Sequence, residues 1–206
     1  NLNQWLSTRL TGWQPVELFD STIGGDWTRA DLIDSKTKLD CYIGMDLSAT
    51  TDLSAIVTIF PPQTGLEKWR VLFDAFIPLE NMQERVARDR VPYDQWLAQG
   101  FIHATPGNII DYGYIERKRL EYAQVFNIVE IGADMSLATG LLQRLEEQGI
   151  KGVPVPQNYA TLTEPMNLVE VLLKKGEMEH EDHPVARWNF GNTSIHTNGN
   201  GQYKYV

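Results

Sequence analysis

Apolar residues in the first half of the chain recur with the spacing of β-strands. Residues 41–47 and 54–60 are apolar runs of strand length, and two prolines end the second run. Residues 68–76 instead alternate, which places every second residue on one face: Trp69, Val71, Phe73 and Ala75. Alternation of this kind is typical of an antiparallel strand. The first half therefore predicts three strands.

Helical spacing begins after the third predicted strand. Residues 80–99 are helical in character, with a break at Pro92. Residues 112–126 keep the same spacing, and Asp111 is available to cap them. The apolar run at 127–133 then predicts a strand.

The remaining elements are predicted mainly from caps and turns. Ser136 would cap a helix that Gly149 ends, and residues 153–155 read as a short strand. Capping-box spacing at 161–164, with Pro165 in the first turn, predicts a last helix. Its core-facing residues would be Leu168, Val169, Leu172 and Leu173. Residues 185–190 and 193–205 would form a hairpin rich in Asn and Gly.

This order predicts an α/β fold with a mixed β-sheet and helices on both faces. The ribonuclease H-like fold has the same order of elements. Residues 41–206 would form that domain. Residues 1–40 carry isolated aromatic side chains without a sustained period, which predicts an arm or linker.

Composition narrows the class of protein. The 206 residues are 42% hydrophobic and 22% charged, which is typical of a soluble globular domain, and no apolar run is long enough to span a membrane. Cys41 is the only cysteine, so an internal disulfide is excluded and a reducing cytoplasm is favoured. The net charge of −9 argues against tight non-specific DNA binding by this chain alone.

Two aspartates are the main candidates for chemistry. Asp46 and Asp134 each end an apolar run, so each is expected at the edge of the sheet. Acids on adjacent strands could share divalent metal ions for phosphodiester cleavage. Asp134 could instead cap the next helix, although Ser136 competes for that role. Asp52 is either an accessory ligand or part of a polar turn, with neither reading favoured.

Other readings of residues 44–55 fit less well. A calcium-binding loop would need a glycine at Thr51 and a glutamate at Val57. The phosphate loop of an actin-like ATPase would need a glycine at Ser48. The segment His180-Glu181-Asp182-His183 could bind a transition metal, but a solvated loop is the favoured reading.

Several stretches, in this order, resemble the nuclease portion of the large terminase subunit of tailed bacteriophages and prophages. They are Tyr42-Ile43-Gly44-Met45-Asp46-Leu47-Ser48 with Thr51-Asp52-Leu53-Ser54-Ala55, Thr105-Pro106-Gly107-Asn108 with Ile110-Asp111-Tyr112, Gly132-Ala133-Asp134, Val153-Pro154-Val155-Pro156-Gln157, and Pro184 with Trp188 and Asn192.

The resemblance implies a ribonuclease H-like endonuclease that cuts concatemeric double-stranded DNA during genome packaging in the cytoplasm of the bacterial host. By position, Asp46 and Asp134 match the catalytic, metal-binding acids, and Asp52 matches an accessory acid. The implied cofactor is Mg²⁺ or Mn²⁺ in a two-metal site. The implied partners are a portal protein and a small terminase subunit.

The resemblance also implies segments outside this chain. An ATPase domain would precede the arm at residues 1–40. A third acid would lie on a helix beyond Val206, after a hairpin that Tyr203-Lys204-Tyr205 resembles. Without that acid, whether the isolated domain cuts DNA is left open.

Two rival functions are compatible with the same fold. One is a catalytically idle domain that docks on packaging partners, which the acidic charge and the missing third acid favour. The other is a different ribonuclease H-like nuclease, such as a resolvase or transposase core. The Trp-rich arm and the Pro-x-x-x-Trp-x-x-x-Asn spacing at 184–192 argue against the second rival.

Overall fold

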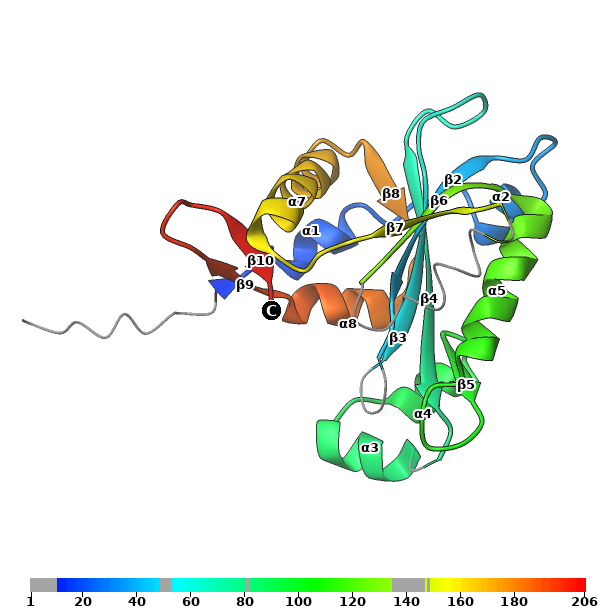
Figure 1. The fold of residues 1–206 in the computed structure, drawn as a ribbon, viewed down its shortest axis with the longest axis vertical. Helices are drawn as coiled ribbons and strands as arrows, with labels where there is room; N and C mark the ends of the chain where they lie inside the picture. The colour runs from blue at the N-terminus through cyan, green and yellow to red at the C-terminus, as the bar shows by residue number, and fades with distance from the viewer. Residues whose placement is uncertain (1–10, 49–52, 81, 135–146, 148) are drawn as a thin grey trace, which may run out of the picture.

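The computed structural model describes residues 11–48, 53–80, 82–134, 147 and 149–206 as a layered α/β fold (Figure 1). Its larger sheet has the strand order β5-β4-β3-β2-β6-β7, with β8 beside β4. These strands are β2 (Asp40–Asp46), β3 (Ser54–Phe60), β4 (Trp69–Pro78), β5 (Ile102–Thr105), β6 (Asn127–Ala133), β7 (Lys151–Pro154) and β8 (Met178–His180).

The sheet is mixed, as predicted. The strands β2, β3 and β4 are antiparallel neighbours, which confirms the meander. The pairs β2–β6, β6–β7, β4–β5 and β4–β8 are parallel. The strands β2, β4, β5, β6 and β7 therefore share one direction, and their carboxyl ends meet at one edge of the sheet.

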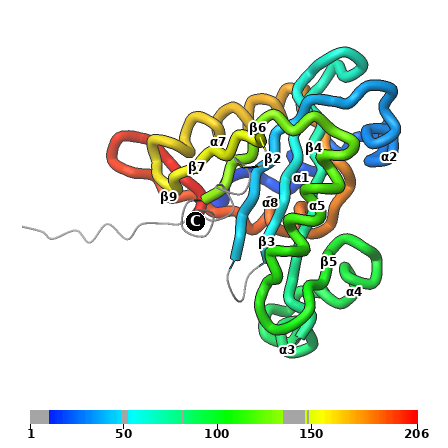
Figure 2. The backbone as a smooth tube through the Cα atoms, turned by 45° about the vertical axis from the view of Figure 1, so that its right-hand side comes forward, coloured from blue at the N-terminus to red at the C-terminus, as the bar shows by residue number. Residues whose placement is uncertain are grey.

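Helices cover both faces of this sheet (Figure 1). On one face, α2 (Arg29–Ile33) and α5 (Tyr112–Val125) bury Leu32, Ile115 and Tyr122 against the central strands. On the other face lie α1 (Val16–Asp20), α7 (Tyr159–Lys174) and α8 (Pro184–Asn192). The turned view in Figure 2 shows α5 running across its face of the strands. Right-handed crossovers produce this division, because α5 and α7 connect strands in opposite directions across the sheet.

Two smaller units complete the fold. The helices α3 (Met82–Asp89) and α4 (Tyr93–Ala98) extend beyond one end of the sheet with β5 (Figure 2). The predicted break at Pro92 is confirmed, since it separates these two helices. A second sheet joins β1 (Thr11–Gly12), β9 (Ser194–Thr197) and β10 (Tyr203–Tyr205).

The sequence predicted the last third of the chain less well. The helix α7 begins at Tyr159, because Asn158 caps it by accepting a hydrogen bond from the Thr161 amide, so Pro165 lies inside the helix. The exposed fraction of Leu168 is 53%, so this residue does not face the core. Residues 184–192 form α8 and not a strand, since His183 caps them and Pro184 occupies the first turn. The hairpin is confined to β9 and β10.

Two predictions fall wholly or partly outside the described residues. The helix expected from Ser136 to Gly149 lies almost entirely outside them. Asp52 lies wholly outside them. Of the helices that are described, none combines the length and the apolar character needed to cross a membrane.

Candidate functional site

The two predicted aspartates lie beside each other at the carboxyl ends of parallel strands. Asp46 is the last residue of β2, and Asp134 directly follows β6. Their preceding residues, Met45 and Ala133, are register partners and are both buried. Because side chains alternate along a strand, Asp46 and Asp134 both project to the opposite, α7-bearing face. Asp46 is exposed and Asp134 is partly buried. We call these two strand ends the acid edge.

Two glycines precede the acid edge on the strands that carry it. Gly44 and Gly132 are register partners and stand two residues before Asp46 and Asp134, on the same face. A Cβ atom built on Gly44 would meet no atom closer than 4.0 Å, whereas one on Gly132 would come within 3.1 Å of Val155 Cγ2. Gly44 therefore leaves open space on this face before Asp46, whereas the Val155 side chain packs over Gly132.

Tyr205 and Gln157 also lie near the acid edge. The amide of Val155 donates to the carbonyl of Ala133, so the chain after β7 continues beside Asp134. The hydroxyl of Tyr205, on β10, donates to Gln157 Oε1. Partial burial and the charges of Asp46 and Asp134 raise the pKa of the Tyr205 hydroxyl above its ordinary value, outweighing the opposite effect of Gln157. The bonds of Val155 to Ala133 and of Tyr205 to Gln157 together connect β10 to the strand that Asp134 follows.

The acid edge offers two carboxylates to a metal ion. In the described part of the chain, no three His, Cys, Asp or Glu side chains converge on a common point. Mg²⁺ commonly binds through one or two carboxylates and keeps several waters, so the pair fits one such ion. The predicted accessory acid, Asp52, lies outside the described residues.

An apolar cavity of about 430 Å³ adjoins the acid edge. Asp46 contributes to its lining, together with apolar residues of β3, β4, α7 and α8 such as Val57, Phe73, Leu173 and Phe190. Its walls offer few hydrogen-bonding groups. It is therefore unsuited to hold a phosphate group.

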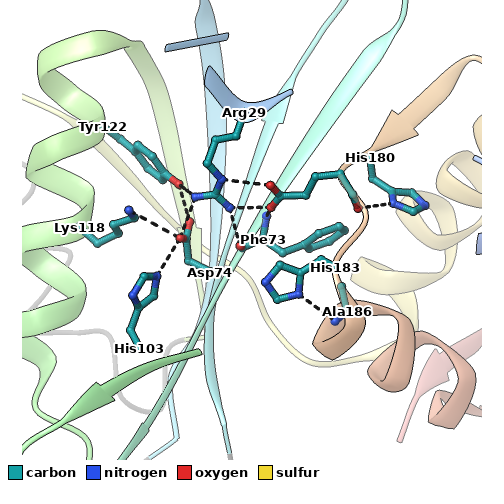
Figure 3. A network of polar contacts seen from close by, with 10 residues as sticks. Arg29, Phe73, Asp74, His103, Lys118, Tyr122, His180, His183 and Ala186 are labelled. Atoms are coloured by element: carbon teal, nitrogen blue, oxygen red, sulfur yellow. Dashed lines mark hydrogen bonds and ion pairs between the residues drawn. The ribbon is translucent and has the colours of Figure 1, made fainter. Parts of the chain in front are cut away.

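A buried ion-pair network, which sequence reasoning did not find, lies around Asp74 on β4 (Figure 3). Arg29 of α2 bonds to Asp74 Oδ1 at 2.9 Å and to Glu181 Oε1 at 2.6 Å. Three further side chains surround the Asp74 carboxylate: Tyr122 through Oδ2, and His103 and Lys118 through Oδ1. The Asp74 side chain is only 2% exposed.

This network fills a gap in the sheet. The outer edge of β4 pairs with β8 at residues 69–71 and with β5 at residues 75–78. Between them, the amide of Phe73 donates to Glu181 Oε1 at 2.7 Å, and its carbonyl accepts from Arg29 Nη2 at 2.7 Å. The Arg29–Glu181 pair thus satisfies backbone groups that a neighbouring strand would otherwise bond.

Both readings of the segment His180-Glu181-Asp182-His183 are corrected by its contacts. His180 and His183 are buried, so the segment is not a solvated loop. His180 bonds to Thr22 and packs on Phe19, whereas His183 accepts the Ala186 amide at the start of α8. Among the described residues, no three His, Cys, Asp or Glu side chains gather there to hold a metal ion. The segment is structural.

The network makes folding sensitive to acid. Burial alone would raise the pKa of Asp74, but the hydrogen bond from His103 and the charge of Arg29 outweigh it and lower the pKa. A lowered carboxyl pKa stabilises the fold above the unfolded-state value of about 4, and this stability is lost as the pH falls toward the folded-state value.

We therefore expect the free energy of unfolding to fall between about pH 5 and pH 2, with a shallower slope for Asp74→Asn. The variant should also be less stable at pH 7. Urea unfolding followed by circular dichroism at several pH values measures both quantities. Equal slopes for the two proteins would contradict this role of Asp74.

The strand order, with two acids on central parallel strands, defines a ribonuclease H-like nuclease fold. The chain belongs to the terminase large subunit, endonuclease domain, family, which it matches over residues 21–206.

Two curated relatives are similar over most of this chain. The large terminase subunit of Enterobacteria phage HK97 is 29% identical over 196 residues, which cover 90% of this chain and 35% of that protein. Protein YmfN of Escherichia coli (strain K12) is 23% identical over 205 residues, covering 93% and 42% respectively. The chain thus spans less than half the length of these relatives.

Solved structures of terminases share the fold. The crystal structure of the HK97 bacteriophage large terminase has a TM-score of 0.80 at 23% identity. The match covers 96% of this chain and 40% of that chain. The large terminase nuclease of thermophilic phage G20c has a TM-score of 0.58 at 12% identity, covering 92% and 86%. A second structure of that nuclease, with bound magnesium, has a TM-score of 0.56 at 12% identity, covering 93% and 86%.

Proposed function

We propose that this chain is the metal-dependent DNA endonuclease domain of a large terminase subunit, and that it cuts concatemeric DNA during genome packaging. The observation that supports this most strongly is the acid edge, where Asp46 and Asp134 project from neighbouring parallel strands to one face. Gly44 and Gly132, two residues before them on the same strands, add no side chain to this face.

Asp46 and Asp134 would hold one or two Mg²⁺ or Mn²⁺ ions, with Asp52 as an accessory ligand. The magnesium-bound structure of the related phage G20c nuclease supports the choice of metal. A divalent ion bound here supplies phosphodiester hydrolysis with an activated water and with neutralisation of phosphate charge. The protein's own contribution is to fix two carboxylates on rigid strands of a central sheet, which orients the ion.

We assign DNA binding and the contacts with packaging partners to the whole protein. The net charge of −9 disfavours contact with many phosphates by this chain alone. We therefore propose that other segments or partners, such as a portal protein and a small terminase subunit, bring double-stranded DNA to the acid edge. This would take place in the cytoplasm of the bacterial host, with an upstream ATPase domain joined through residues 1–40.

Metal-dependent cutting by the full-length protein tests the proposed function. We expect supercoiled plasmid to be nicked or linearised with Mn²⁺ or Mg²⁺, and to stay intact when a chelator removes the metal. Gel electrophoresis of the plasmid measures both. Cutting that persists in chelator would contradict a metal-dependent site.

A catalytically idle docking domain is the second candidate. Two observations favour it. No three metal-binding side chains converge among the described residues, and the net charge of the chain is −9. If the full-length protein leaves DNA intact with either metal while it binds a packaging partner, this second function replaces the first.

A further inference from the structure

The β9–β10 hairpin carries an uncharged hydroxyl group toward the acid edge. Tyr205 lies on β10, whose neighbour β9 pairs in turn with β1. The pairing of Tyr205 with Ile195, and a hydrogen bond from the Val206 amide to the Ser194 carbonyl, fix its backbone. Its side chain is not buried, since Tyr205 is 41% exposed. A substrate at the acid edge could therefore reach it.

Gln157 ties this end of the hairpin to the loop between β7 and α7. Its side-chain oxygen accepts the Tyr205 hydroxyl, and its backbone carbonyl accepts the Lys204 ammonium at 3.3 Å. Two consecutive residues of β10 thus bond to one residue that follows β7, the strand next to β6. This double attachment holds Tyr205 in place near Asp46 and Asp134.

The chemistry of the pair suits a phosphate group. Tyrosine hydroxyls are among the groups that bond to DNA phosphate oxygens. A tyrosine hydroxyl has an ordinary pKa of about 10, so it carries its proton at neutral pH. It can therefore donate to a phosphate. Gln157 carries both an acceptor and a donor, so a rotated amide could donate to the same hydroxyl while that hydroxyl donates to the substrate.

We propose that the Tyr205 hydroxyl, held by Gln157, contacts the DNA phosphate group at which the acid edge cuts. This inference rests on the proposed nuclease function. It adds a substrate contact from outside the central sheet, and it requires the β9–β10 hairpin to be in place for efficient cutting. Lys204 serves the same end by anchoring the hairpin on Gln157.

The test compares two tyrosines of the same strand in the full-length protein. Tyr205→Phe removes the hydroxyl near the acids, whereas Tyr203→Phe removes one that bonds to Asn167 of α7 at 2.6 Å. Because a hydrogen bond to a charged group is lost, Tyr205→Phe should slow plasmid cutting at saturating DNA by about 10- to 100-fold. Tyr203→Phe should cut at the wild-type rate, and Gln157→Ala should lose less activity than Tyr205→Phe.

Two further readouts separate a substrate contact from a structural role. For Tyr205→Phe, the melting temperature should fall no further than for Gln157→Ala, which loses the same hydrogen bond, and the Mn²⁺ affinity should equal that of the wild type. A wild-type cutting rate would overturn the proposal, and so would a loss of Mn²⁺ affinity. If the full-length wild type never cuts, or if Asp46→Asn still cuts, the nuclease function itself fails and this inference fails with it.

Discussion

Replacing Asp46 with asparagine should abolish metal-dependent DNA cutting by the full-length protein without disturbing its fold. The substitution keeps the shape of the side chain but removes one of two carboxylates at the acid edge, and so weakens the hold on a divalent ion. Because a bound ion contributes several kcal/mol to hydrolysis, we expect a loss of at least about a thousandfold in the cutting rate. Asp134→Asn should give a similar loss.

A matched control lies on the same strand. Asp40 begins β2 at the opposite end from Asp46 and is exposed, with its carboxylate accepting from Asn127. Asp40→Asn changes the net charge equally, so it should retain cutting while Asp46→Asn loses it. Comparable rates for the two variants would mean that the acid edge is not the reacting site.

Removing the Arg29 side chain should cause the largest loss of stability. Arg29→Ala leaves the Asp74 and Glu181 carboxylates without their shared cation, and it leaves the Phe73 carbonyl without its donor. Truncating one partner of a buried ion pair costs about 3–5 kcal/mol. Thermal and urea unfolding monitored by circular dichroism measure this loss.

Arg187→Ala provides the comparison for Arg29→Ala. Arg187 also bonds to a carboxylate, that of Asp20, but both side chains are well exposed. Exposed ion pairs contribute little to stability because water screens them, so this variant should unfold almost as the wild type does. If the two substitutions destabilised the protein equally, the burial of the network around Asp74 would not explain its contribution to stability.

Five strands of the larger sheet, β2, β3, β4, β6 and β7, were predictable because they carry their own pattern, whereas β5 and β8 were not predicted. Residues 54–60 and 127–133 were assigned to strands whose bounds agree with β3 and β6, since apolar runs of that length have few alternatives. The two aspartates could be placed at one edge for the same reason. Strand direction and order follow from the sequence of elements, and together they bring Asp46 beside Asp134.

Contacts between distant segments could not be predicted in this way. Arg29 lies in the segment that was predicted to be an arm, and its partners Asp74 and Glu181 are 45 and 152 residues away. The sequence contains one indication of this network. Asp74 stands between Phe73 and Ala75 in an apolar strand, and a buried charge needs a partner.

The errors near the end of the chain have local causes. Residues 185–190 were taken for a strand because Asn and Gly are frequent nearby, whereas His183 and Pro184 start a helix there. Leu168 was assigned to the core from helical spacing alone. Its exposure shows that the core-facing side of α7 is set by what packs against it.

Manganese titration calorimetry on the wild type, Asp46→Asn, Asp134→Asn and the double variant asks whether the two carboxylates hold a common ion. If they do, each single substitution removes the same binding event, and the double variant loses little more than either single one. If the losses add independently, or if neither substitution changes the affinity for Mn²⁺, the two aspartates do not form one metal site.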